Sequence, residues 1–402
     1  MSTIGNNSSN KNKENIGRIC GCYGCGVCVA ACPQKVIKME LVGGFYSPVV
    51  EQEGCVECGI CLNVCAFNHK EICAIEEGKE NTPIENFAAY VNNPQLRKRV
   101  TSGGIVYTIA KEGVAQGAKF CGVRYDIPRQ RAEHYIASTA EELLPSIGSK
   151  YIQSYSAEAF SALTLAAEQK YIVVGTPCQI DSLRRLMRSR KCEQNFLFID
   201  FFCHGVPSLL MWQKYLASVR QKVGDEKVVK FRSKANGWHE STTTEVEGER
   251  GTIISPMSKG DLFFKFFLGD RCLNAACYDS CKYKYTACCA DIRVGDLWGK
   301  KYRSDDNGVS AVVCFTQKGA EAVKRVADCT IVSESFTDVA DFQLKQNAKR
   351  APSYNVVKKL LTTSKTIEQI DKAANRAELP LKTIRTAAYY LRRLLQKAGL
   401  KR

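Results

Sequence analysis

The chain has 402 residues, including 21 cysteines, and its 57 Lys and Arg outnumber its 41 Asp and Glu to give a formal charge of +16. This length allows two or three domains and excludes a miniprotein that needs disulfides to fold. Cysteine makes up about 5% of the chain, below the roughly 8–10% of small secreted disulfide scaffolds, so the cysteine spacing has to indicate what the thiols do.

The first segment, residues 1–17, is polar and rich in Asn, Ser and Lys, which predicts a disordered N-terminus without a secretory signal. The longest apolar stretches, Phe196–Cys203 and Leu262–Gly269, each contain a charged residue and are too short to span a bilayer. We therefore expect a cytoplasmic protein without a transmembrane segment. In that compartment clustered cysteines are metal ligands or catalytic groups more often than disulfides.

A cysteine-dense segment follows, and it predicts a ferredoxin-type domain over residues 18–76 with two 4Fe–4S clusters. Its motif C-x2-C-x2-C-x3-C occurs twice, with a proline after the first copy and Ala66 in that position of the second. The motif cysteines are Cys22, Cys25, Cys28 and Cys32, then Cys55, Cys58, Cys61 and Cys65.

The fourth cysteine of each copy is expected to cross over, because in two-cluster ferredoxins it ligates the other cluster. One cluster then has the ligands Cys22, Cys25, Cys28 and Cys65, and the other has Cys55, Cys58, Cys61 and Cys32. The alternative, zinc, usually takes two cysteine pairs set well apart, so two complete four-cysteine copies favour iron and sulfide. Cys20 and Cys73 are left over and are expected to be buried spare thiols, although Cys20 could compete for the first cluster.

After a charged, proline-containing connection, a larger mixed α/β domain is predicted over residues 87–350. Short apolar runs alternate with helix-like stretches there. The runs are Phe87–Val91, Lys119–Val123, Tyr171–Gly175 and Phe196–Phe202, and the helix-like stretches include Gly103–Glu112 and Glu158–Gln169. Neither a G-x-G-x-x-G nor a Walker loop nor a G-x-S-x-G elbow occurs between residues 87 and 402, so ordinary Rossmann nicotinamide binding is not supported. The fold class expected is α+β.

Several short sequence motifs in this domain, which we call islands, together resemble those of a known family. They are Thr101-Ser102-Gly103-Gly104, Gly148 to Ser154, Gly175-Thr176-Pro177-Cys178-Gln179, Cys203-His204-Gly205-Val206-Pro207, Gly237-Trp238, Cys277 with Cys281, and Ala290 to Gly299. In this order they resemble the coenzyme F420 hydrogenase/dehydrogenase beta subunit family, in the bacterial form with an N-terminal double ferredoxin module. The resemblance runs from about residue 20 to residue 300. It implies an iron–sulfur flavoprotein that binds FAD, and often a further 4Fe–4S cluster.

Cofactor residues follow from the same islands. Ser102, Gly103 and Gly104 would offer backbone N–H groups to a flavin pyrophosphate, although a plain helix cap explains them equally well. Ser149, Lys150, Tyr151 and Gln153 suit a phosphate and a flavin ring, or form an ordinary strand with polar ends. Thr176, Pro177 and Gln179 are further cofactor candidates. A third cluster would take Cys178, Cys203, Cys277 and Cys281, although Cys272, Cys288 and Cys289 lie near and leave the ligand choice open.

No catalytic residue is assigned. His204 could be a ligand or a proton donor but is more simply structural, and Asp291 or Asp296 could hold a turn or orient Arg293. The function expected is an oxidoreductase that couples hydride transfer at FAD, with F420 or another two-electron partner, to one-electron transfer through the clusters. The alternatives are a noncatalytic electron-transfer subunit and a reductase in polysaccharide or cell-surface biosynthesis. The partner is a redox protein or a hydride-carrying coenzyme.

A basic helical tail is predicted over residues 351–402. Its last part, residues 381–402, has seven basic residues, no acidic one, and apolar residues at helical spacing. It is a solvated terminal helix or docks onto an acidic partner or an anionic membrane surface. No nucleic-acid recognition motif accompanies the charge.

Overall fold

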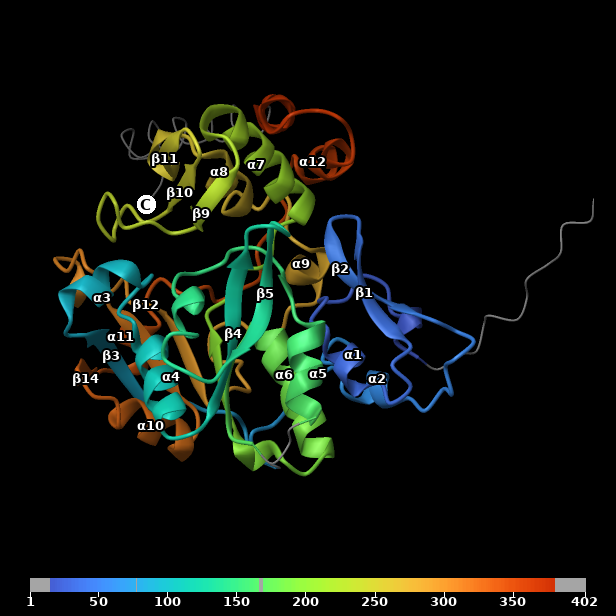
Figure 1. Ribbon diagram of the computed structural model, residues 1–402, viewed down its shortest axis with the longest axis vertical. Helices are drawn as coiled ribbons and strands as arrows, with labels where there is room; N and C mark the ends of the chain where they lie inside the picture. Colours follow the sequence, from blue (N-terminus) through green and yellow to red (C-terminus); the bar gives the residue numbers. More distant parts are fainter. Residues whose placement is uncertain (1–14, 77, 166–168, 380–402) are drawn as a thin grey trace, which may run out of the picture.

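The computed structural model describes residues 15–76, 78–165 and 169–379. These residues form a ferredoxin-like module, a large sheet domain beside it and a smaller lobe above the sheet (Figure 1). The module, drawn in blue, lies against the helices α5 (Ala157–Leu165) and α6 (Pro177–Ser189) of the sheet domain. No helix among these residues is long and apolar enough to cross a membrane.

The ferredoxin-like module contains an antiparallel hairpin and two short helices, each of which follows a cysteine loop. Its elements are η1 (Ile16–Arg18), α1 (Val27–Ala31), β1 (Ile37–Val42), β2 (Phe45–Val50) and α2 (Ile60–Asn63). Gly26 and Gly59 precede α1 and α2 with φ of 78° and 70°. Because L-residues with a side chain avoid this left-handed region, glycine permits the tight turn from each cysteine loop into its helix.

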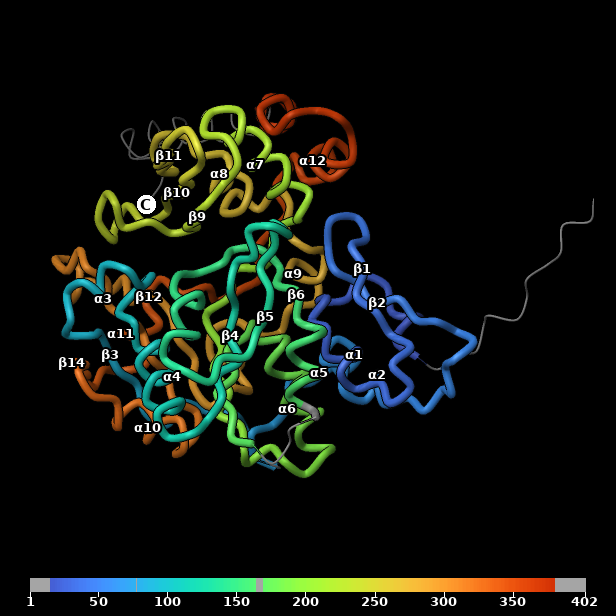
Figure 2. Tube along the Cα trace, in the orientation of Figure 1, coloured from blue at the N-terminus to red at the C-terminus, as the bar shows by residue number. Residues whose placement is uncertain are grey.

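The large domain is built on a nine-stranded mixed sheet in the order β14-β3-β13-β12-β8-β7-β4-β5-β6. Strands β12, β8, β7 and β4 run parallel in the centre. Figure 2 shows β3 from the start of the domain beside β14 from its end, and these two strands pair in antiparallel fashion. The strands are β3 (Glu85–Val91), β4 (Lys119–Asp126), β5 (Arg131–Ala137), β6 (Ser154–Tyr155), β7 (Tyr171–Val174), β8 (Phe196–Phe201), β12 (Ile292–Asp296), β13 (Ser310–Cys314) and β14 (Cys329–Ser333).

Helices cover both faces of this sheet. Residues of α4 and α10 share one apolar core with the strands, while residues of α5, α6 and α11 share another with α1 of the module. The elements not yet given are α3 (Pro94–Arg99), α4 (Ile105–Ala115), η2 (Leu144–Ser146), η3 (Glu193–Asn195), α9 (Ala275–Asp279), η5 (Lys300–Tyr302), α10 (Gln317–Lys324) and α11 (Phe336–Val339).

The smaller lobe has a three-stranded antiparallel sheet in the order β11-β10-β9, packed against helices. Trp212, Phe231 and Phe263 form its aromatic core, with ring centroids 4.6–5.5 Å apart. The elements are α7 (Leu209–Val223), β9 (Glu226–Lys230), β10 (Thr243–Gly248), β11 (Gly251–Pro256), η4 (Met257–Lys259), α8 (Leu262–Phe267) and α12 (Tyr354–Leu361), followed by a helix over 367–379.

The structure confirms the predicted fold class of a ferredoxin-like module, a mixed α/β domain and C-terminal helices. The four apolar runs fall on β3, β4, β7 and β8, and the two helix-like stretches overlap α4 and α5. The described part of the C-terminal segment is helical but is not a free tail, because Val357, Ile367 and Ile370 are buried in the core of the smaller lobe. The basic helix predicted over 381–402 and the polar residues 1–14 lie outside the described residues, and the predicted domain boundaries stay predictions.

Candidate functional site

The thiols predicted to bind the first cluster share one neighbourhood. Burial raises the pKa of Cys22 to about 11 and of Cys65 to about 12, and the neighbouring thiols contribute to both shifts. The pKa of Cys28 lies well above its usual value because of burial and then of Cys25, Cys22 and Cys65. The fourth cysteine of the second copy thus lies with the first three of the first copy, as the crossed assignment requires.

The thiols predicted for the second cluster lie at the outer end of the module. Cys32, Cys55, Cys58 and Cys61 line one cavity. Cys58 is exposed, and the Asn15 side-chain nitrogen lies 3.5 Å from the Cys55 sulfur. One cluster site is therefore buried against the large domain and the other is open to a partner.

Among the described residues, no group of three or more His, Cys, Asp or Glu side chains is placed to hold a single metal ion. Of the two spare thiols, Cys73 is buried as expected, but Cys20 is exposed, so the prediction that it is a buried thiol is wrong.

Four cysteines of the large domain also come together. Cys178, Cys203, Cys277 and Cys281 line one cavity at the carboxyl ends of the central parallel strands. Cys178 is in the first turn of α6, Cys203 follows β8, and the other two lie on or just after α9. In contrast, Cys272, Cys288 and Cys289 are buried away from this cavity. The geometry favours the predicted set for a third cluster.

Burial makes the sites of Cys178, Cys203 and Cys277 unsuited to free thiolates. It raises the pKa of Cys203 to about 11 against the opposing charge of Lys284, and the pKa of Cys277 to about 12 with the help of Cys203. The pKa of Cys178 is raised most by burial and next by Cys25 of the module. Iron binding would displace these protons. Gly205 lies so close that a Cβ there would be 3.2 Å from the Cys277 Cβ.

Helix α6 connects this cysteine group with the module. Ser182, one turn after Cys178 and so on the same face, is fully buried. Its hydroxyl oxygen lies 3.5 Å from the Cys25 sulfur and accepts the Ala66 backbone N–H at 3.0 Å. Cys25 itself lines the cavity. The first cluster site, α6 and the cavity are therefore in contact.

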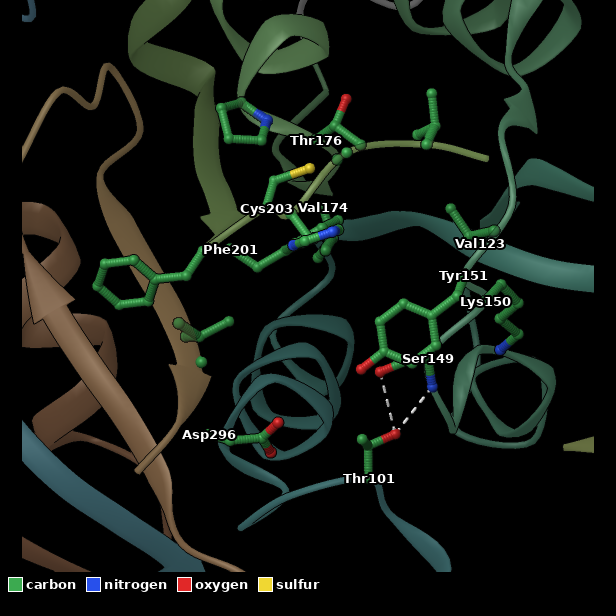
Figure 3. A pocket seen from close by; sticks show the side chains of 18 of the residues that line it. Thr101, Val123, Ser149, Lys150, Tyr151, Val174, Thr176, Phe201, Cys203 and Asp296 are labelled. Atoms are coloured by element: carbon green, nitrogen blue, oxygen red, sulfur yellow. Dashed lines mark hydrogen bonds between the residues drawn. The ribbon is translucent and has the colours of Figure 1, made fainter. Parts of the chain in front are cut away.

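The cavity has a volume of about 640 Å³, within the range of cofactor pockets. Nine of the ten predicted cofactor residues line it: Ser102, Gly104, Ser149, Lys150, Tyr151, Gln153, Thr176, Pro177 and Gln179. Figure 3 shows Thr101, Ser149 and Tyr151 on one wall, Asp296 across from them, and Thr176 and Cys203 toward one end. The Ser149 backbone N–H donates to Thr101 Oγ1 at 2.8 Å.

Gly103 is the exception, and the expectation that its N–H is free for a pyrophosphate is wrong. That N–H donates to Ser310 Oγ at 3.0 Å, and a Cβ at Gly103 would lie 2.0 Å from the Ala89 carbonyl oxygen. Gly103 therefore allows close packing on the sheet. The first residues of α4, which begins directly after Gly104 without a side-chain cap, line the cavity instead; they are Ile105, Val106 and Tyr107.

Residues from two of the predicted islands line the cavity and also stabilise the structure around it. Thr176 and Gln179 form a capping box at α6, with Pro177 in the first turn. Gln153 Oε1 accepts the Tyr46 N–H at 2.7 Å, and Gln153 Nε2 lies 3.3 Å from the carbonyl oxygens of both Tyr23 and Gly24. Gln153 thus fastens a cysteine loop of the module to the cavity wall.

Lys150 and Arg232 are two basic side chains in the cavity wall. Burial lowers the pKa of Lys150 to about 7, and its Nζ donates to the carbonyl oxygens of Pro145 and Ile147. Arg232 pairs with Asp296 and donates to the Tyr151 hydroxyl at 3.3 Å. Asp296 Oδ1 is buried without a hydrogen-bond partner among the described residues. The unpaired Asp296 Oδ1 fits a ligand with N–H donors. The Arg232 guanidinium and the uncapped N-terminus of α4 fit a ligand with phosphates. FAD has both kinds of group.

Sequence reasoning missed Arg232, which no motif marks. It named Trp238 and Trp298 in two islands but gave them no role, whereas their rings stack at 4.5 Å and Trp298 lines the cavity. It left open whether Asp291 or Asp296 holds a turn or orients Arg293. The partner is Asp200, whose carboxylate accepts two hydrogen bonds from the Arg293 guanidinium at 2.7 and 2.8 Å with both side chains fully buried. His204 lines the cavity and pairs with Asp270 at 2.8 Å.

Comparisons with known proteins agree with this arrangement. Residues 168–339 match the family described as the C terminus of the coenzyme F420 hydrogenase/dehydrogenase beta subunit, and residues 21–69 match the 4Fe-4S dicluster domain. The two matches confirm the predicted resemblance to this beta subunit family in its form with a double ferredoxin module. Residues 168–339 are thus similar to an oxidoreductase beta subunit, and residues 21–69 are similar to an iron–sulfur dicluster domain.

One solved structure aligns with part of the chain. It is the xenon-derivatized F420-reducing NiFe hydrogenase complex from Methanosarcina barkeri, of which one chain shares 18% identity with this one. The alignment covers 75% of this chain and 93% of that chain, with a TM-score of 0.47. Among curated proteins, none matches the sequence.

Proposed function

We propose that the protein is an iron–sulfur flavoprotein oxidoreductase that exchanges hydride with a two-electron partner at FAD and single electrons with a one-electron partner at its ferredoxin-like module. One observation carries this proposal. The cavity that holds the predicted flavin residues is also lined by Cys178, Cys203, Cys277 and Cys281 and by Cys25 of the module. A flavin converts between hydride and single electrons, so a flavin site is useful where it meets cluster sites.

The chain offers separate groups to the two ends of FAD. The uncapped N-terminus of α4 favours the negative pyrophosphate, because backbone N–H groups and the helix dipole both attract anions. Tyr151 and Trp298 give aromatic surface. Asp296, held by Arg232, offers a buried acceptor to a ring or ribose N–H or O–H.

The cysteines form a continuous series from the cavity to the surface. Cys178 lies at the positive end of α6, which stabilises a negatively charged cluster. Ser182 then connects α6 to Cys25 of the first module cluster. The crossed fourth ligands link that cluster to the second one, where Cys58 is exposed. An external redox partner would reach the chain there, while a hydride-carrying coenzyme would enter the cavity.

The decisive experiment is the iron, acid-labile sulfide and flavin content of protein purified without oxygen. About 12 iron and one flavin per chain would support three four-iron clusters and the flavin-coupled reaction. About eight iron with flavin would remove the third cluster but keep the enzyme. About eight iron without flavin, even after incubation with FAD, would leave a noncatalytic electron-transfer subunit.

A matched pair of variants sharpens this result. Cys203→Ser removes a cavity thiol, whereas Cys192→Ser removes a buried thiol outside the cavity. The proposal expects the first variant to lose about four iron per chain and the second to lose none. Equal iron in the two variants would contradict a cluster at Cys203.

A further inference from the structure

Two lysines that lie two positions apart contact the loops of two different cluster sites. Lys282 Nζ donates to the carbonyl oxygen of Ala66 at 2.8 Å, and Ala66 directly follows Cys65, a predicted ligand of the first cluster. Lys284 Nζ donates to the carbonyl oxygen of Cys203, a predicted ligand of the third cluster, at 2.6 Å. Each ammonium group therefore lies beside a loop that would bind iron.

Further hydrogen bonds fix each ammonium group in place. Lys282 Nζ also donates to the carbonyl oxygens of His69 at 2.6 Å and Glu71 at 3.1 Å. Lys284 Nζ also donates to the carbonyl oxygen of His204 at 3.2 Å. Both lysine side chains are half-buried. The fold thus sets the positions of the two positive charges.

The residue between the two lysines anchors the segment that carries them. Tyr283 is buried, and its hydroxyl donates to the Asp181 carboxylate on α6 at 2.8 Å. From this anchor, Lys282 reaches the ferredoxin-like module and Lys284 reaches the loop after β8. One short segment therefore delivers one charge to each of two cluster sites.

Neither lysine has an ion pair within the part of the chain that the structure describes. Asp200, which contributes to the raised pKa of Cys203, is paired with Arg293 instead. Burial is the main cause of the raised pKa of Cys203 and Cys277, and the Lys284 ammonium opposes it at both thiols. The charge of Lys284 thus acts on the cysteines around it.

A positive charge near a cluster favours reduction, because the reduced cluster carries one more negative charge. We propose that the two lysines tune electron transfer: Lys282 raises the reduction potential of the first cluster, and Lys284 raises that of the third. The Lys284 half of the inference rests on the proposed function, because it requires the third cluster. The Lys282 half requires only the first cluster of the module.

This tuning matches the electron count of the proposed reaction. A hydride delivers two electrons, whereas each four-iron cluster takes up one. With both potentials raised, the two electrons of one hydride can rest on the third and first clusters, one on each, while the proton leaves to water. The flavin site is thereby oxidised again before an outside acceptor has bound.

The test is a redox titration of the anaerobically purified protein, followed by electron paramagnetic resonance. Cys22→Ser and Cys203→Ser, which each remove a predicted ligand, assign the signals of the first and third clusters. Lys282→Gln and Lys284→Gln remove the charge but keep a side-chain N–H donor for the carbonyl oxygens. We expect Lys284→Gln to lower the ratio of reduced to oxidised third cluster at a fixed potential about tenfold, which for one electron is about 59 mV. Lys282→Gln should have a similar effect on the first cluster.

Each glutamine variant is the control for the other, because both remove one positive charge from the same segment. Lys282→Arg and Lys284→Arg keep the charge and should keep the parent potentials. Lys227→Gln removes an exposed lysine of the smaller lobe and should change neither potential. A lysine that only holds its loop in place would not produce this crossed pattern.

Three results would overturn the inference. One is unchanged potentials in both glutamine variants. Another is an equal shift of the first and third clusters in one variant, which would be a general effect of net charge. The third is the loss of about four iron per chain from either glutamine variant, because the lysine would then hold the cluster loop and not tune it.

Failure of the proposed function is distinguishable from these results. The parent protein would then contain about eight iron per chain and lack the third signal, and the Lys284 half of the inference would be wrong with it. The effect of Lys282→Gln on the first cluster would still be measured and would decide the other half.

Discussion

The Ser182 hydroxyl oxygen lies 3.5 Å from the Cys25 sulfur, so a helix of the sheet domain touches a cluster-binding loop of the module. Ser182 Oγ accepts the Cys25 thiol proton and a backbone N–H from Ala66. Burial raises the pKa of Cys25 and the hydrogen bond with Ser182 lowers it, so Ser182 would donate its own proton to a Cys25 thiolate. A hydrogen bond to a cluster sulfur stabilises the more negative, reduced cluster.

Ser182→Ala should therefore lower the reduction potential of the first cluster. Loss of one hydrogen bond is worth about 1 kcal/mol, which for one electron corresponds to about 40 mV. Ser189→Ala, at the other end of the same helix, is the control because its hydroxyl donates to the Leu186 carbonyl. A redox titration followed by electron paramagnetic resonance gives both values. Equal potentials in the two variants would mean that Ser182 does not donate to the cluster.

Cys58→Ser should remove or damage the outer cluster and the transfer of electrons to an external acceptor, while any FAD stays bound. Cys58 is exposed and far along the series of cysteines from the cavity. Cys20→Ser is the control, because Cys20 is exposed but belongs to neither motif. Iron and flavin analysis of both variants is the measurement. Loss of FAD from Cys58→Ser alone would contradict separate electron-transfer and flavin sites.

Gly205→Ala should impair the third cluster. The new methyl group would lie 2.9 Å from Leu273 Cδ1 and 3.2 Å from Cys277 Cβ, so the loop or the cysteine must move. Gly251→Ala is the matched control, because Gly251 has a similar positive φ of 134° but no atom lies within 4 Å of the added Cβ. Iron content should fall by about four atoms per chain in the first variant only. If both variants keep full iron, crowding at Cys277 does not matter for the cluster.

Asp200→Ala should destabilise the fold strongly. Asp200 and Arg293 are fully buried, and Arg293 also donates to the carbonyl oxygens of Tyr285 and Ala287. Removing one partner of a buried pair leaves an uncompensated charge and costs about 3–5 kcal/mol. Arg325→Ala breaks the exposed pair with Glu321 and should cost about 0.5 kcal/mol or less. Denaturant unfolding of the two variants tests this difference, and a comparable small loss in both would refute it.

Lys150→Met should change how stability depends on pH. Burial lowers the pKa of Lys150 to about 7 in the folded chain, whereas an unfolded lysine has a pKa of about 10.4. Between these values the unfolded chain binds one proton more, so the parent gains stability as pH rises above about 7. The variant lacks this gain. Melting temperatures at pH values below and above 7 should show the parent improving relative to Lys150→Met, and parallel curves would show that Lys150 is charged in the folded state.

Local patterns explain which features could be predicted. The motif cysteines, the four apolar runs and the turn islands each depend on residues close together in the sequence, and their structures follow that spacing. Thr176 and Gln179 show what local patterns cannot decide. The same residues form the capping box of α6 and line the cavity, and the sequence alone does not separate these two roles.

Long-range pairing explains what could not be predicted. Asp200 and Arg293 are 93 positions apart, and Arg232 and Asp296 are 64 apart. No local pattern distinguishes the true partner of Arg293 from Asp291 or Asp296. The smaller lobe was missed for a similar reason, since its core joins α7 and α8 to the helices near residues 354–374. Gly103 shows a third limit, because its role depends on how closely the Ala89 backbone approaches.

The attachment of the module has a kinetic consequence. Gln153, Lys282 and Ser156 fasten its cysteine loops and the Ala66 to Glu71 segment to the sheet domain. Under the proposed function, electron passage between the cavity and the module is then a first-order event, independent of protein concentration and nearly independent of ionic strength. The two encounters with outside partners, at the face around Cys58 and at the cavity, are second order, and those between charged groups are sensitive to salt. The proposed function thus makes the molecule a rigid electron-transfer unit without a mobile carrier domain.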